Sequence, residues 1–254
     1  MSWTAVVLAG SRPGRDVFAE QFGTDLKALI PVGGEPMVRR PVRALLESGE
    51  IARVLVMAQE VERIAAALPE DPRISVRTSN GTIAETILEL IGDASVEWPL
   101  LVTTADHALL DAATIEELSN GSQGADVAIG VVERRNLMRR LAATKRTWLP
   151  FRGGAYTGAN LFALRSRQVA AAVELWRSVE QDRKKAWRVM SILGPLMLAS
   201  VALRLVSLDE VLGQIGGKLN LSVKAVRLSN PLAGVDVDKP EDHALVEDIL
   251  AGRA

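Results

Sequence analysis

The sequence contains no cysteine and only two histidines, His107 and His243, among its 254 residues. The absence of cysteine excludes disulfide bonds, zinc–thiolate sites and thiol catalysis. Because two histidines are too few for a histidine-rich metal centre, any metal is expected to be a hard cation bound by carboxylates and phosphates. The formal net charge is only −1. A protein that grips nucleic acid usually carries a strongly basic face, so no nucleic-acid partner is expected.

The chain also lacks a leader-like segment and a long apolar run. The opening residues MSWTAVVLAG have neither the basic stretch nor the cleavage site of a signal peptide. Val189–Leu203 is uncharged, but it contains Gly194-Pro195 and is shorter than the roughly 20 apolar residues of a transmembrane helix. We therefore expect a cytoplasmic protein in which this stretch forms buried or interfacial helices.

Short apolar runs rich in β-branched residues alternate with longer stretches of helical periodicity. The predicted strands are Thr4–Leu8, Arg53–Met57, Ile74–Arg77, Leu100–Thr104, Asp126–Val132, Asn160–Ala163 and Ala225–Leu228. The predicted helices are Met37–Ser48, Val61–Leu68, Ile83–Ile91, Ala112–Leu118 and Ser166–Val179.

This alternation predicts a three-layer α/β/α fold, Rossmann-like, around a mainly parallel sheet of about seven strands. No repeat or linker divides the chain, so residues 1–254 are predicted to form a single domain. The stretch 183–221 breaks the alternation and predicts a helical insertion. In such folds the ligand crevice lies outside the carboxyl ends of the strands, where strand order reverses.

The loop after the first strand is the first candidate site. Leu8–Arg15 combines glycines with Arg12 and Arg15, and Lys27 follows in DLKALIPVGGEPM. Backbone N–H groups in such a loop can bind an anion, and the three cations could neutralise a triphosphate. The loop matches neither a P-loop nor a dinucleotide fingerprint. The alternative is an ordinary turn with solvated arginines.

Two later segments contain acidic residues that could bind a metal. Asp106 comes directly after the strand LLVTT, a position suited to Mg²⁺; Asp111 is better placed to cap the next helix. Asp236 and Asp238 are two residues apart in GVDVDKPED, so in an extended chain they point to the same side. Pro240 is predicted to start the closing helix. The alternative for Asp238 is that it caps this helix.

Two polar loops are further candidates. Residues 78–82 (TSNGT) precede a helix, so Asn80, Gly81 and Thr82 could hold a base or phosphate. Residues 153–160 are rich in glycine and include Tyr156, the only tyrosine. The alternative for this second loop is a hairpin turn that enters a strand.

Taken together, these stretches resemble the MobA-like nucleotidyltransferases, a group with a GT-A-like fold. The resemblance rests on VVLAG at Val6–Gly10, on Lys27 with GGEPM at Gly33–Met37, on TAD at Thr104–Asp106 and on GVDVDKPED at Gly234–Asp242. It implies that Arg15 and Lys27 face the triphosphate and that Asp106 and Asp236 hold Mg²⁺ or Mn²⁺, and the position of Asp238 makes it a further candidate ligand. It also implies that Leu8, Ala9, Gly10, Asn80 and Gly81 contact the nucleotide. The loops themselves add Ser11, Arg12, Gly14 and Thr82 as nucleotide-binding candidates. Tyr156, Gly158 and Asn160 are the candidates for binding the acceptor.

The resemblance implies transfer of a nucleotidyl group from an NTP, with CTP or GTP favoured, to a small phosphorylated acceptor. The acceptor would be a polyol, sugar or cofactor phosphate, and pyrophosphate would leave. A glycosyltransferase is one alternative, although Thr104 occupies the first position of the D-x-D that it would need. A nucleotide sensor without catalytic activity is the other.

Some features depart from the family pattern or lie outside it. Ser11 stands where the family usually has glycine, and the insert DVFAEQFGTD lengthens the loop before Lys27, so that it could act as a lid. The apolar and basic residues of 183–206 are compatible with a buried helix, a homodimer contact or a peripheral membrane contact.

Overall fold

The computed structural model describes residues 2–10, 14–79, 81–142, 144, 146–180 and 186–254, with the backbone alone for residues 179, 180 and 186–192. The candidates Ser11, Arg12 and Asn80 lie outside the described residues, as do residues 183–185.

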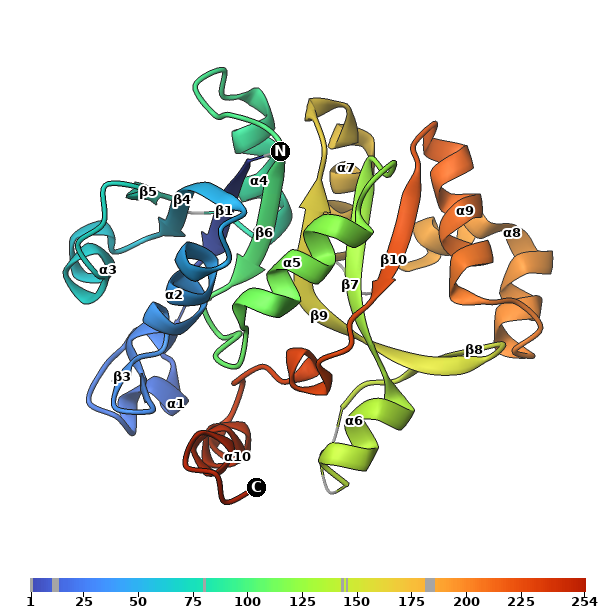
Figure 1. Cartoon of the computed structure of the whole chain (residues 1–254). Coiled ribbons are helices and arrows are strands. Elements are labelled where there is room, and N and C mark those ends of the chain that lie inside the picture. Colours follow the sequence, from blue (N-terminus) through green and yellow to red (C-terminus); the bar gives the residue numbers. More distant parts are fainter. Residues whose placement is uncertain (1, 11–13, 80, 143, 145, 181–185) are drawn as a thin grey trace.

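An eight-stranded sheet forms the centre of the molecule (Figure 1). Seven of its strands follow the order β10-β7-β9-β6-β1-β4-β5, and β8 pairs with β9 at the side. Only β9 runs antiparallel to its neighbours on this path, so the predicted mainly parallel sheet is confirmed. The strands on the path are β1 (Trp3–Leu8), β4 (Ile51–Ala58), β5 (Ile74–Thr78), β6 (Leu100–Thr104), β7 (Val127–Glu133), β9 (Gly154–Leu164) and β10 (Val223–Arg227).

Helices cover both faces of the sheet, which confirms the three-layer prediction (Figure 1). On one face, apolar side chains of four helices pack in the main core: α2 (Arg39–Glu47), α3 (Val61–Ala67), α5 (Ala112–Gly121) and α10 (Pro240–Leu250). On the other face, α4 (Ile83–Gly92) and α7 (Ala170–Glu180) cover a second apolar cluster. Trp3 and Val246, from opposite ends of the chain, belong to the same main core. The assignment of all 254 residues to one domain stays a prediction.

The predicted helical insertion is present as α8 (Ala186–Ala202) and α9 (Leu208–Leu219). α8 is kinked where Gly194, at φ 76°, precedes Pro195. Ser207 begins α9 with a capping box that it forms with Glu210. Leu208 and Leu212 of α9 pack against Tyr156 and Ala225 of the sheet, so the insertion thickens one face of the sheet.

Several short elements were not predicted from the sequence because each is too brief to show a period. The GGEPM stretch folds as a small hairpin of β2 (Pro31–Val32) and β3 (Glu35–Pro36), with Gly33 and Gly34 at positive φ in its turn. The other short helices and strands are α1 (Val17–Glu20), η1 (Lys27–Leu29), α6 (Arg134–Arg140), β8 (Leu149–Phe151), η2 (Arg167–Val169) and η4 (Pro231–Gly234).

Strand order reverses at β1. The chain runs from β1 through β4 to β5 on one side and then crosses to β6 on the other side of β1. The carboxyl ends of these strands are held together, since Ala9 donates to the Met57 carbonyl at 2.9 Å and Ala105 to the Leu8 carbonyl at 3.0 Å. A crevice at such a switch point is where α/β sheets bind ligands.

Within the described residues, no helix is both long enough and apolar enough to cross a membrane.

Candidate active site

Lys27 lies beside two carboxylates at the switch point between β1 and β6. Its Nζ is 2.7 Å from Asp106 Oδ2 and 2.5 Å from Asp238 Oδ1. Burial by itself lowers the pKa of Lys27, but attraction to Asp106 and hydrogen bonds to Asp106 and Asp238 exceed this effect, so the pKa is raised. Lys27 is therefore a fixed cation at neutral pH.

Asp106 is positioned by the loop that follows β6. Thr104 Oγ1 donates to Asp106 Oδ1 at 2.5 Å, so Thr104 orients the carboxylate whose other oxygen meets Lys27. The Asp106 carbonyl accepts a hydrogen bond of 3.1 Å from Val237 N. This backbone bond brings the distant segment of Asp236 and Asp238 to the loop of Asp106.

Alternation along the closing segment places its two aspartates on one side, as the sequence predicted. Val235 and Val237 are buried in the main core, whereas Asp236 is half-buried and Asp238 is exposed. The closing helix α10 does begin at Pro240. The alternative that Asp238 caps this helix was wrong, because the N-cap position belongs to the next residue, Lys239, whose side chain makes no cap hydrogen bond.

A second cation, Arg146, binds the remaining carboxylates. Its guanidinium bonds to Asp236, and its Nη2 lies 3.0 Å from Asp242 Oδ1. The Arg146 side chain is only 9% exposed, and its Nε is buried without a hydrogen-bond partner among the described residues. Asn160, at a positive-φ position in β9, donates from Nδ2 to Asp236 Oδ2 at 3.3 Å.

These carboxylates form one electrostatic group. Burial and then repulsion from Asp238 raise the pKa of Asp236, and Arg146 offsets only part of this rise. A cation bound among Asp106, Asp236 and Asp238 would relieve the repulsion, and carboxylate oxygens are the donors that Mg²⁺ and Mn²⁺ prefer. The donor set therefore fits such a metal. Among the described residues, however, no three acidic or histidine side chains already surround a common metal position.

The predicted residues of the first loop divide into two groups. Leu8, Ala9 and Gly10 lie at the end of β1, at the switch point of the sheet. Arg15 does not join Lys27 in this structure, because its exposed side chain bonds to Glu20 of α1. Gly14 is at φ 110° with open space around it.

The loop before α4 has a clear structural role. Thr82 caps α4 in a capping box with Glu85. A Cβ on Gly81 would lie 2.8 Å from the Glu85 Cβ, so the close approach requires glycine. These contacts explain why glycine and threonine occupy positions 81 and 82 even if neither residue binds a nucleotide. Their nucleotide-binding role stays a prediction.

Of the three predicted acceptor residues, only Asn160 bonds to one of these carboxylates, that of Asp236. Tyr156 is buried against Leu208 and Leu212, and the Arg227 guanidinium lies over its ring at 5.4 Å. Gly158 is exposed, with open space where a side chain would be.

The insert before Lys27 is packed against the closing helix. Asp16 caps α1, and the Phe18 and Phe22 rings meet at 5.6 Å, with Phe22 lying 4.6 Å from the His243 ring of α10. Its action as a lid stays a prediction.

Sequence reasoning missed Arg146 and Asp242. Asp242 lay within the GVDVDKPED stretch without an assigned role, and Arg146 belongs to no recognisable motif. Only the fold brings Arg146 within bonding distance of a segment 90 residues later in the chain.

Comparison with known proteins identifies the family. The family model described as MobA-like NTP transferase domain matches residues 5–201. The chain belongs to this family. The family is the one that the sequence predicted.

Individual relatives of this MobA-like NTP transferase agree with that assignment. The chain is 34% identical over 113 residues to a 2-C-methyl-D-erythritol 4-phosphate cytidylyltransferase of Nocardia farcinica. That match covers 42% of the chain and 49% of the relative, so the chain spans about half the length of this curated protein. A hypothetical transferase from Thermus thermophilus is 28% identical, with a TM-score of 0.78 over 96% of this chain and 100% of that one.

A more distant structure shows the same fold. The 4-diphosphocytidyl-2C-methyl-D-erythritol synthase from Anaerococcus prevotii is 13% identical, with a TM-score of 0.62 over 98% of this chain and 96% of that one. This likeness bears on the fold alone.

Proposed function

We propose that this MobA-like NTP transferase moves a cytidylyl group from CTP to a small phosphorylated acceptor and releases pyrophosphate. The observation that carries the proposal is the bridge of Lys27 between Asp106 and Asp238 at the switch point of the sheet. It supplies a half-buried cation for phosphates beside carboxylates for a metal. CTP is favoured over GTP because the curated relative is by name a cytidylyltransferase.

The metal would be held by Asp106 and Asp236, with Asp238 beside them. A divalent ion bound there supplies charge neutralisation for the phosphates. Asn160 and Arg146 hold Asp236 from two sides, so its carboxylate is fixed before any ligand arrives. Fixed donors and cations of this kind lower the barrier because they need little rearrangement during the reaction.

Lys27 would exchange its carboxylate partners for phosphate oxygens of the nucleotide. An oxygen of the acceptor phosphate then forms a bond to the α-phosphorus, and the bond from that phosphorus to the bridging oxygen of the β-phosphate breaks. The electron pair leaves with pyrophosphate, whose negative charge Lys27 offsets. No histidine or cysteine nucleophile is needed, since positioning and charge neutralisation provide the catalysis.

The test is pyrophosphate release in the presence of Mg²⁺. CTP, GTP, ATP and UTP are each combined with a panel of polyol, sugar, cofactor and alkyl phosphates. We expect release with CTP and one acceptor class, and loss of release in Asp106→Ala. Release only with another nucleotide would overturn the choice of CTP. Liberation of nucleoside diphosphate from sugar nucleotides, without pyrophosphate, would instead indicate a glycosyltransferase.

A further inference from the structure

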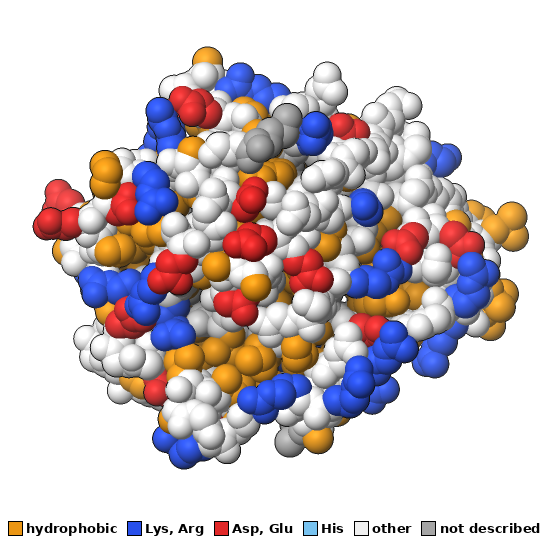
Figure 2. All heavy atoms as spheres, in the orientation of Figure 1, with side chains coloured by type: hydrophobic (Ala, Val, Ile, Leu, Met, Phe, Trp, Pro, Cys, Tyr) orange, Lys and Arg blue, Asp and Glu red, His pale blue; other side chains and the backbone are white. Residues whose placement is uncertain are grey.

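A cavity of about 680 Å³ lies between α6, the residues that follow it and α10. Its size is within the usual range of small-molecule sites, roughly 300–1,000 Å³. Figure 2 shows apolar side chains bordered by basic ones in this part of the surface. The lining residues are Arg140, Leu141, Ala142, Thr144, Lys239, Glu241, Asp242, Leu245 and Ala254.

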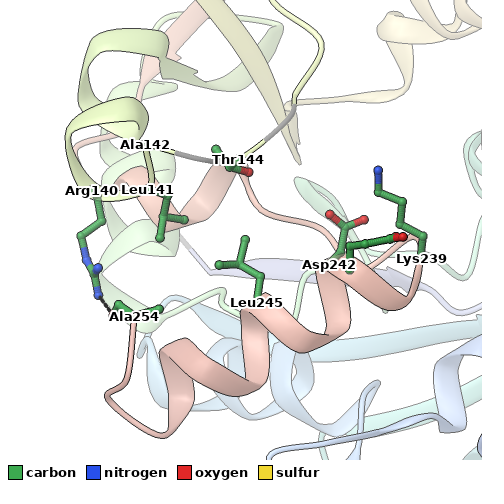
Figure 3. A pocket seen from close by; sticks show the side chains of 9 residues that line it. Arg140, Leu141, Ala142, Thr144, Lys239, Asp242, Leu245 and Ala254 are labelled. Carbon is green, nitrogen blue, oxygen red and sulfur yellow. Dashed lines mark hydrogen bonds between the residues drawn. The ribbon is translucent and has the colours of Figure 1, made fainter.

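The cavity has a polar end and an apolar middle, and side chains of α10 and of the segment after α6 face it (Figure 3). Lys239 and Asp242 lie at one end, whereas Leu141 and Leu245 face each other farther along α10, with Thr144 above them. A ligand with a charged end and a short apolar body would match this arrangement.

The polar end of the cavity carries one cation, Lys239, and two carboxylates, Glu241 and Asp242. The two Asp242 oxygens accept from Arg146 Nη2 at 3.0 Å and from Asp238 N at 3.3 Å, so this carboxylate is already compensated. Lys239 makes no ion pair with any described residue. Glu241 is exposed at the start of α10. Lys239, which is exposed like Glu241, is the cation available to a ligand at this end of the cavity.

The cavity adjoins the active site through Asp242. That carboxylate lines the cavity and bonds both to the backbone of Asp238 and to the arginine that holds Asp236. An anion beside Lys239 would thus lie next to the proposed metal ligands, where an attacking phosphate is needed.

We propose that this cavity binds the acceptor, and that the acceptor is a phosphate monoester with a short apolar body. Lys239 binds the phosphate, and Leu141, Ala142 and Leu245 contact the organic part. The inference rests on the proposed nucleotidyl transfer and replaces Tyr156 and Gly158 as acceptor contacts.

Binding of n-butyl phosphate to the full chain tests the cavity without nucleotide or metal. Titration is followed by the methyl NMR signals of Leu141 and Leu245, with glycerol 3-phosphate and inorganic phosphate as comparison probes. We expect saturable shifts with n-butyl phosphate and affinity weaker by about tenfold for either comparison probe, since neither fills the apolar middle.

Variants locate the site. Lys239→Met is expected to weaken n-butyl phosphate binding about tenfold, the effect of losing one charge-assisted contact. Ala142→Trp places a large side chain in the cavity from an exposed position and is expected to abolish binding. Lys218→Met, an exposed lysine on α9, is the matched control and should bind as the wild type does.

The possible outcomes separate the cavity from the proposed transfer. The absence of a saturable shift in the wild type would overturn the cavity as the acceptor site. So would n-butyl phosphate affinity in both Lys239→Met and Ala142→Trp equal to that of the wild type. Inorganic phosphate binding as tightly as n-butyl phosphate would overturn the apolar acceptor. If Lys239→Met and Ala142→Trp weaken binding as expected but no acceptor supports pyrophosphate release, the cavity is a binding site and the proposed transfer is wrong.

Discussion

The ammonium group of Lys27 lies 2.7 Å from the Asp106 carboxylate, although 79 residues separate them in the chain. The first loop and the loop after β6 meet because β1 and β6 are neighbours in the sheet. Lys27 also bonds to Asp238, so one side chain connects three segments of the active site.

Replacing Lys27 should remove phosphate binding and leave the fold in place. We expect Lys27→Met to lower kcat/KM for pyrophosphate release by at least about 100-fold, because a fixed charge facing the transferring phosphates is worth roughly 3 kcal/mol. Lys218→Met is the control. Activity of Lys27→Met within about twofold of the wild type would show that Lys27 does not act on the phosphates.

Asp106 should be required for metal binding itself. Asp106→Asn is expected to weaken Mn²⁺ binding about tenfold or more, measured by electron paramagnetic resonance without nucleotide, because it removes one anionic ligand. Asp111→Asn is the matched control from the same loop, since asparagine also caps a helix well. Equal Mn²⁺ affinity in Asp106→Asn and wild type would remove Asp106 from the metal site.

Arg146 should stabilise the fold, since it compensates two carboxylates while largely buried. Arg146→Met is expected to lower the free energy of unfolding by about 3 kcal/mol, because it leaves Asp236 and Asp242 without this counter-charge. Urea unfolding measures the change, and adding Asp242→Asn should restore part of the loss.

The exposed pair of Arg152 and Glu210 provides the comparison. Arg152→Met should cost below about 1 kcal/mol, the usual range of a surface ion pair. Similar losses in Arg146→Met and Arg152→Met would show that burial of Arg146 adds nothing to the strength of its contacts.

His107 should make the fold sensitive to acid. Burial lowers its pKa from 6.5 to about 4, although Asp106 and Asp111 partly oppose the shift. As pH falls below 6.5, the unfolded chain binds a proton that the folded chain does not, so stability is lost until pH reaches about 4. The full loss is roughly 3 kcal/mol.

Urea unfolding of wild type and His107→Gln in metal-free buffer, at about pH 7, 5.5 and 4.5, isolates this contribution. The difference in the free energy of unfolding between the two proteins at about pH 7 reports the effect of the substitution on packing. The wild type should then lose more stability than the variant as pH falls. If the free energy of unfolding changes equally with pH in the wild type and in His107→Gln, the pKa of His107 is the same in the folded and the unfolded chain.

The sequence by itself determined the layers of the fold and part of the site. Apolar runs with strand or helix periodicity are local signals, so all seven strands of the main path could be found from them. Asp111 and Pro240 could likewise be assigned, because a helix start depends on neighbouring residues. Lys27, Asp106 and Asp236 could be named as candidates from the sequence, and the structure brings Lys27 and Asp106 together, whereas their roles stay a prediction.

Only the tertiary structure decided which side chains meet. Arg146 reaches Asp236 across 90 residues, and Tyr156, a predicted acceptor contact, is buried against Leu208 and Leu212 of α9. Neither fact has a local signal, because each depends on which strands pair and how a helix packs on them. The cavity beside Lys239 has the same origin: it exists because α6 and α10, far apart in sequence, lie at the same end of the sheet.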